Sequence, residues 1–139
     1  MAKYPSQGTV FQVTISAVLT TVANCTEINP PDPEVEIIET TDLTVTHGKT
    51  FDTTGLVDAG ECGGSLFFDP ANATHTFLTG QVKAPVANTL LACKCTYSDV
   101  APTSWTFNAI VKKFTPKVAI GEFLKADFAL KVSGVVTGW

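Results

Sequence analysis

EFLKADFALKVSG, from Glu122 to Gly134, is the stretch that decides the fold. Apolar side chains occupy every second position from Leu124 to Val132, and charged side chains such as Lys125 and Lys131 fall between them. A period of two places successive side chains on opposite faces of a β-strand, so that one face packs on a core while the other meets solvent. The stretch therefore predicts a long strand near the end of the chain.

Five further segments have strand-like patterns: GTVFQVTI (8–15), PEVEIIETTDLTV (33–45), SLFFDP (65–70), NTLLACKCTY (88–97) and SWTFNAIVKKF (104–114). CTEINPPDPE (25–34) is proline-rich and predicts a turn and spacer. Asp69 can cap a helix and Pro70 suits its first position, so we expect one helix at about 70–80. These elements predict a mainly β fold, a β-sandwich or open barrel of about seven strands with one short packed helix, in a single domain spanning 1–139.

The composition excludes several classes of protein. With 45% hydrophobic and 16% charged residues over 139 positions, the chain can bury a core and is not disordered. The net charge is −4 and all nine basic residues are lysines, which argues against specific nucleic-acid recognition. Polar residues interrupt the apolar stretch VTISAVLTTVANC (13–25), so we expect neither a signal peptide nor a membrane span.

Motifs for enzymatic chemistry are missing from the sequence. It contains no G-x-S-x-G, and no glycine-rich segment is followed by Lys-Ser/Thr. His47 and His75, the two histidines, lack ligand spacing, and the four cysteines lack paired C-x-x-C motifs. We expect buried free thiols, with a Cys25–Cys62 disulfide or a zinc site as alternatives. No catalytic activity, cofactor or metal is predicted.

Four carboxylates lie in the segment 33–45: Glu34, Glu36, Glu39 and Asp42. They could form an acid–base site, a metal site, a solvated face or an electrostatic lining. Glu34 and Glu36 are two apart on one predicted strand, so they share a side and do not oppose each other across a cleft as glycosidase carboxylates do. A calcium site would need an Asp/Asn-rich loop with glycine, and DAGECGG (58–64) is too poor in oxygen ligands for one. A solvated face and an electrostatic lining are the interpretations that we carry forward.

The charges are distributed asymmetrically along the chain. No basic residue lies between Lys3 and Lys49, whereas seven of the nine lysines fall from Lys83 onward. Opposed poles suit head-to-tail association between copies, and the alternative is that both faces are solvated. After position 45 the hydrophobic pattern lapses, and the glycine- and threonine-rich segment 46–60 predicts a long loop that a partner orders.

The order of motifs resembles the major tail tube protein of long-tailed bacteriophages. The matching segments are DLTVTHG (42–48), TTGLVDAGE (53–61), GGSLFFDP (63–70), SWTFNAIVKKF (104–114) and AIGEFLKADFALKVSG (119–134). Their order and spacing extend across roughly two thirds of the chain, and the first forty residues match less well.

The resemblance implies a non-enzymatic virion protein, made in the host cytoplasm, whose hexameric rings stack into a tail tube. It implies that the loop 46–60 reaches an adjacent ring, which assigns inter-ring contacts to His47, Lys49, Phe51, Leu56 and Asp58. The implied partners are further copies of the chain, a tape-measure protein, terminator and tip proteins, and double-stranded DNA that passes without specific binding.

The acidic strand then has a hypothetical role. A bore lined by carboxylates repels phosphates, so we predict that at least two of Glu34, Glu36, Glu39 and Asp42 face the lumen. Outward-facing, solubilising charge is the rival interpretation. In a different class of function, the chain would be a secreted Ig-like adhesion or carbohydrate-binding module.

Overall fold

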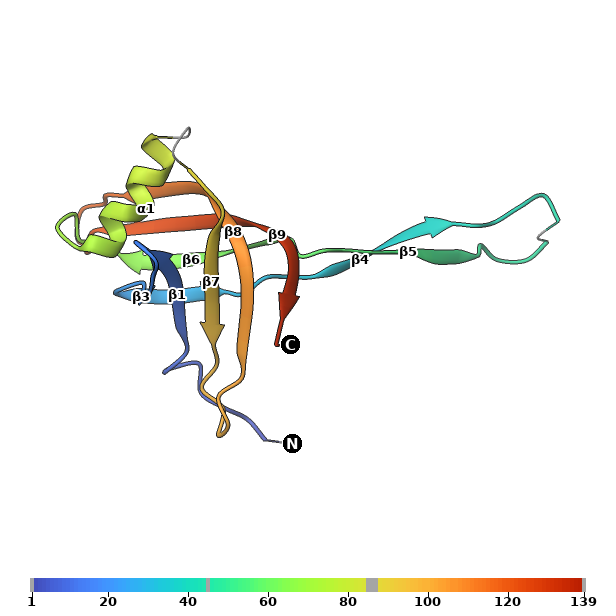
Figure 1. Ribbon diagram of the computed structural model, residues 1–139, viewed down its shortest axis with the longest axis horizontal. Coiled ribbons are helices and arrows are strands. Elements are labelled where there is room, and N and C mark those ends of the chain that lie inside the picture. Colours follow the sequence, from blue (N-terminus) through green and yellow to red (C-terminus); the bar gives the residue numbers. More distant parts are fainter. Residues whose placement is uncertain (1, 45, 85–87, 139) are drawn as a thin grey trace.

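The computed structural model describes residues 2–44, 46–84 and 88–138. Seven strands form one antiparallel sheet in the order β2-β1-β7-β8-β9-β6-β3, and β4 and β5 form a separate hairpin (Figure 1). The elements are β1 (Val10–Ile15), β2 (Val18–Thr21), β3 (Cys25–Asn29), β4 (Glu34–Glu39), β5 (Phe51–Asp58), β6 (Glu61–Phe67), α1 (Ala73–Lys83), β7 (Leu91–Thr96), β8 (Ser104–Lys117) and β9 (Lys125–Thr137). The predicted mainly β class with one short helix is confirmed.

The alternation in β9 sets the inside of the sheet. Ala126, Phe128, Leu130 and Val132 are buried, while Lys125 and Lys131 are exposed, as the pattern predicts. Leu124 departs from the prediction because it precedes the strand and remains partly exposed. Buried residues of β1, β6, β7 and β8 complete the same core cluster.

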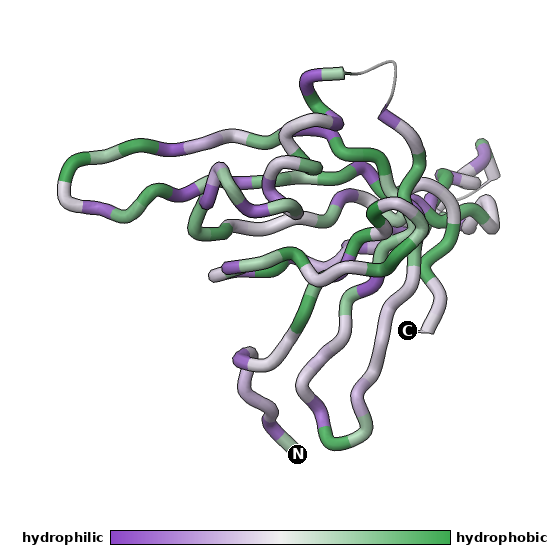
Figure 2. Tube along the Cα trace, turned by 60° about the vertical axis from the view of Figure 1, so that its left-hand side comes forward, coloured by the Kyte–Doolittle hydropathy of each residue, from purple (hydrophilic) through white to green (hydrophobic). Residues whose placement is uncertain are grey.

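The seven-stranded sheet curls around this core. Strands β8 and β9, of 14 and 13 residues, are much longer than their neighbours, and their pairing shifts register twice, near Asn108 and Lys113. Such bulges bend a strand and increase its twist, so one pair of strands can serve two differently oriented halves of the sheet. Figure 2 shows the curled body, with β8 and β9 extending beyond it on the left.

Helix α1 packs against β8 and buries Leu78 and His75. It begins three residues later than predicted, because the side chain of Asn72 accepts the N–H of Thr74 and acts as the N-cap. Asp69 instead accepts the N–H of Ala71 in the preceding turn. The helix also continues through Gly80 to Lys83, beyond its predicted end.

Two segments predicted without regular structure are strands. The turn and spacer at 25–34 contains β3 and the beginning of β4, and the loop at 46–60 contains β5. The acidic strand is also shorter than predicted, because β4 ends at Glu39, and Val45 lies outside the described residues. The chain from β3 to β6 thus forms one long hairpin whose distal half, β4 and β5, projects from the body (Figure 1).

Candidate assembly surface

The projecting hairpin, called the arm here and comprising β4 and β5, is uncovered on both faces. Every residue of both strands is exposed, and within the two-stranded sheet each strand pairs only with the other. An isolated two-stranded hairpin is marginally stable in water, and its open edges are templates for pairing. The arm therefore has the properties of a surface that becomes covered in an assembly.

One face of the arm is apolar. The register pairs Val35 with Val57 and Glu39 with Phe51, and Ile37 lies between them on the same side. Ile37 and Phe51 expose 62% and 60% of their surface, which is unusual for large apolar side chains that lie next to one another. Glu39 is the charged residue of this face, and it lies toward the far end of the arm.

The opposite face of the arm is acidic. Glu34 pairs with Asp58, and Ile38 pairs with Asp52, so these side chains share one side. Glu36 belongs to the same side by strand alternation, and its carboxylate accepts a hydrogen bond from the Thr54 hydroxyl at 3.0 Å. Four carboxylates thus lie on one face of a narrow ribbon, beside the exposed apolar side chains of Ile38 and Leu56: Glu34, Glu36, Asp52 and Asp58.

The base of the arm is tied to the body by charged groups. The Asp58 carboxylate accepts the N–H of Gly60 at 2.9 Å and lies 3.4 Å from the ammonium of Lys131. The hydrogen bond from the Gly60 N–H is the larger cause that lowers the pKa of Asp58, and the positive charge of Lys131 lowers this pKa further. Asp58 therefore stays ionised in moderately acidic solution. Next to it, Glu61 of β6 lies 2.6 Å from Lys112 of β8, across the intervening strand β9. These contacts link the base of the arm to strands β8 and β9 of the body.

The predicted site residues fall in three places. Glu34, Glu36 and Glu39 lie on β4, but Glu39 is on the apolar face. Asp42 lies in the distal turn, where it accepts hydrogen bonds from Thr44, and His47 and Lys49 are exposed near that turn. Phe51, Leu56 and Asp58 belong to β5. The structure thus places six of the nine predicted residues on the two faces of the arm, with Glu34 and Asp58 at its base, and the other three in or near its distal turn.

Sequence reasoning missed Asp52 and the apolar face of the arm. Both depend on β5, a segment for which the sequence predicts a loop. The signal that could have found them is the cross-strand pairing itself, since Val35 and Val57 are recognisable as partners only once the hairpin register is known.

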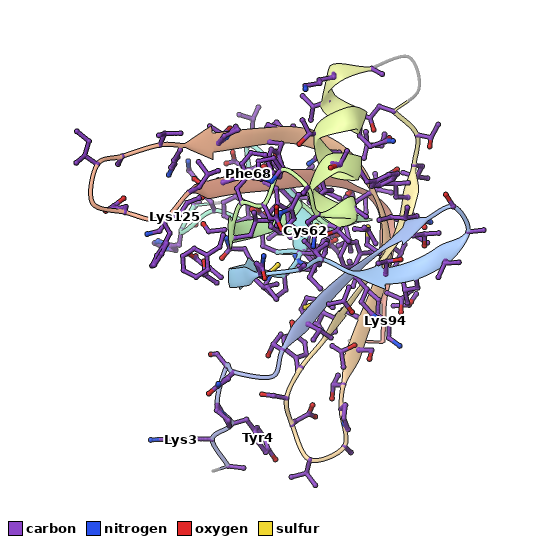
Figure 3. All side chains as sticks on the ribbon, turned by 90° about the vertical axis from the view of Figure 1, so that its left-hand side faces the viewer. Lys3, Tyr4, Cys62, Phe68, Lys94 and Lys125 are labelled. Atoms are coloured by element: carbon purple, nitrogen blue, oxygen red, sulfur yellow. The ribbon has the colours of Figure 1, made fainter. Side chains whose placement is uncertain are left out.

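A second exposed apolar surface, called the tip here, is formed by the turn between β8 and β9 together with Phe67. Ile120 is fully exposed, Phe123 exposes 80% of its surface, and Val118 is similarly open. The ring of Phe67 packs edge-to-face on Phe123, with centroids 6.0 Å apart. Lys125 lies where β9 begins, and Figure 3 shows its side chain beside the base of this turn.

Buried polar residues in the body have structural roles. His75 is fully buried, its Nε2 lies 2.7 Å from the carbonyl of Ala23, and its Nδ1 accepts the N–H of Asp69 at 2.9 Å. All four cysteines are free thiols, and Cys62 lies in the centre of the body (Figure 3). Burial raises the pKa of Cys25 to about 11 and that of Cys93 to about 12, which suppresses thiolate chemistry. The prediction of buried free thiols is confirmed, with Cys25 only partly covered.

Within the described ranges, no three His, Cys, Asp or Glu side chains come together in a way that could hold a metal ion. No helix in the described part of the chain has the length and apolar character needed to cross a bilayer. The surfaces that stand out are therefore the arm and the tip, both suited to protein contacts.

Solved structures with the same architecture are parts of tails and baseplates. A chain of the anti-feeding prophage baseplate, symmetrised sixfold, superposes with a TM-score of 0.80 at 11% identity, covering 99% of this chain and 97% of that one. A chain from the tail of an empty gene transfer agent particle, refined with C6 symmetry, gives 0.75 at 10% identity and covers 99% of both chains. The SPP1 tail tube gives 0.68 at 10% identity, covering 97% of this chain and 80% of that one.

The chain shares the fold of these tail proteins. At such low identity the likeness concerns the fold, and it extends over nearly the whole chain, including the arm. No protein-family model matches the sequence, and no curated protein matches it. The predicted resemblance to tail tube proteins is thus confirmed at the level of the fold.

Proposed function

We propose that this protein is the structural subunit of a bacteriophage-type tail tube, in which hexameric rings stack into a hollow cylinder. The observation that carries the proposal is the uncovered arm on a body with the tail-protein fold. The sixfold symmetry named for two of the similar structures supports rings of six. A non-enzymatic role fits a molecule whose most unusual surfaces are suited to association.

The arm supplies the contact between rings. Its apolar face would be buried against a neighbouring subunit, and each fully buried Val, Ile or Phe side chain stabilises such a contact by about 1.5–3 kcal/mol before ordering costs. Phe51 reaches the neighbour from β5, and His47 and Lys49 reach it from the distal turn. Leu56 and Asp58, which the prediction also assigns to this contact, share the opposite face of the arm and would stay outside it. An interface of this kind lets the ribbon remain uncovered in the free subunit and become ordered in the tube.

The acidic face of the arm would face the bore. If the apolar face is covered, Glu34, Glu36, Asp52 and Asp58 remain open on the other side of the same ribbon. Their negative potential repels the phosphates of a passing duplex over about 8 Å at physiological salt. This arrangement supports the prediction for Glu34 and Glu36, whereas Glu39 would lie in the protein contact. Asp42 would lie at the end of the arm.

Other partners follow from a tube of this kind. A tape-measure protein would fill the bore before the genome passes, and terminator and tip proteins would close the two ends. The protein would then be located in the tail of the virion. Double-stranded DNA would pass through the lumen without specific contacts, and no membrane contact is proposed.

The proposal is tested by concentrating the purified protein and imaging it by negative-stain electron microscopy. We expect hollow tubes of uniform width with a sixfold axial repeat. In matched samples, the Ile37→Asp variant should form only short tubes or none, and its far-ultraviolet circular dichroism should match that of the wild type. A wild-type protein that stays a single folded chain at millimolar concentration would contradict the proposal.

A further inference from the structure

Two apolar surfaces lie at opposite ends of the molecule. The arm projects at one end, and the turn between β8 and β9 lies at the other, as both Figure 1 and Figure 2 show. The two surfaces cannot meet within one chain, so any contact between them joins two copies. A contact between different patches on identical chains is heterologous and repeats from copy to copy.

The two surfaces match in chemistry. The arm offers Val35, Ile37, Phe51 and Val57 as a narrow apolar strip, and the tip offers Val118, Ile120 and Phe123, supported by Phe67. The strip is a twisted two-stranded ribbon, while the tip is a turn whose apolar side chains stand away from the body. A convex turn can seat on such a ribbon and cover apolar area on both sides.

An exposed charge at the edge of the arm's apolar face and an exposed charge beside the tip have opposite signs. The turn of the tip also carries Glu122, which is exposed and has no ion-pair partner within the described residues. Glu39 is exposed on the apolar face of the arm, next to Phe51. Lys125 is exposed beside the tip and is directly opposite Lys117 in the register. Lys117 is bound to Asp127 at 2.6 Å, whereas neither Lys125 nor Glu39 has an ion-pair partner within the described residues.

We propose that the apolar face of the arm docks on the tip of a second copy, with Glu39 of one chain facing Lys125 of the other. This rests on the proposed tube function and identifies which surface of the neighbour receives the arm. The contact can repeat from copy to copy, because donor and acceptor are different surfaces of the same chain. It leaves the acidic face of the arm uncovered, since the tip binds the other side of the ribbon.

A mixing experiment tests the contact with two variants. The arm variant carries Ile37→Asp and Val57→Asp, and the tip variant carries Ile120→Asp and Phe123→Asp. Each variant keeps one intact surface, so neither can continue a head-to-tail series alone. Light scattering should show that each variant alone has the mass of a single unit, which is either one chain or one ring. An equimolar mixture of the two variants should have twice this mass and form nothing larger. Val100→Asp, at an exposed apolar residue in the turn between β7 and β8, is the matched control and should assemble like the wild type.

A charge exchange tests the same contact without relying on the apolar variants. Glu39→Lys or Lys125→Glu alone should raise the concentration needed for assembly at least about fivefold, because an attraction becomes a repulsion. The two exchanges combined in one chain should restore assembly toward that of the wild type. A mixture no heavier than its components, or a double exchange as impaired as the sum of the single ones, would overturn the contact.

The outcomes separate this inference from the proposed function. Tubes that form equally well with the arm and tip variants would refute the contact and leave the tube function standing. Open head-to-tail chains without rings, abolished by either variant, would support the contact and refute the hexameric tube.

Discussion

Reversing the charge of the acidic face is the most direct test of the bore. The face carries Glu34, Glu36, Asp52 and Asp58, which is a charge of about −4 per copy and about −24 per ring of six. Replacing Glu34 and Glu36 with Lys brings this to about zero, and adding Asp52→Lys brings it to about +2 per copy and +12 per ring. All three residues are exposed and none forms an ion pair within the described residues, so the fold should be unchanged.

Nuclease protection provides the assay. Tubes are assembled in the presence of short duplex DNA and then treated with nuclease, which removes any DNA bound outside. Wild-type tubes should protect no DNA, and tubes of the double variant should protect little. Tubes of the triple variant should protect a clear amount of DNA, and this amount should fall steeply between about 50 and 200 mM salt, because phosphate binding releases counterions. A control with Lys at the exposed positions Val100 and Ala101 adds positive charge away from the arm and should protect none. Triple-variant tubes that are intact but hold no protected DNA at low salt would show that this face does not line the bore.

Three further predictions concern the body. Leu78→Ala, at a fully buried helix position, should lower the free energy of unfolding by about 2–5 kcal/mol in denaturant titrations, whereas Val82→Ala, at an exposed one, should change it by less than about 0.5 kcal/mol. Hydrogen bonds from Lys117 and Ser65 lower the pKa of Asp127. The stability that these bonds provide is therefore fully present above the pKa that Asp127 has in the unfolded chain, and it is lost as pH falls through the lower pKa of the folded protein. Asp127→Asn should flatten this acid dependence of the melting temperature. Burial raises the pKa of Cys93 to about 12, so native protein at pH 8 should react far more slowly with a thiol reagent than denatured protein, and equally fast reaction would contradict the buried position.

The strands that sequence predicted best are those with one buried face. In β9, β8 and β7 the alternation of residues reports directly on burial, because each inward position touches the core. The pattern in β3 is weaker, since it is an edge strand of which only Cys25 and Ile28 are partly buried, and Pro30 and Pro31 follow closely. A short edge strand beside prolines looks like a turn in the sequence.

The helix start and the arm were harder to predict for different reasons. Asp69 and Asn72 are both good N-caps three residues apart, and tertiary packing of His75 and Leu78 decides between them. In β5 no residue is buried in the single chain, so no period from a core exists for the sequence to display. A strand that is covered only by another molecule resembles a loop when its sequence is judged against its own core.

The arm can combine adhesion and repulsion because its two faces alternate residue by residue. Between the Val35–Val57 pair and the Ile37–Thr53 pair, β4 advances by two residues and β5 by four, with Gly55 at a positive φ of 82° in the extra segment. An insertion of two residues keeps the parity of the strand, so Phe51 stays on the same side as Val57, and Asp52 on the same side as Asp58. An insertion of one residue would move Asp52 onto the contact face and Phe51 toward the open face. The arm can therefore tolerate this irregular segment only because its length is even, and the separation of the apolar and acidic faces depends on that parity.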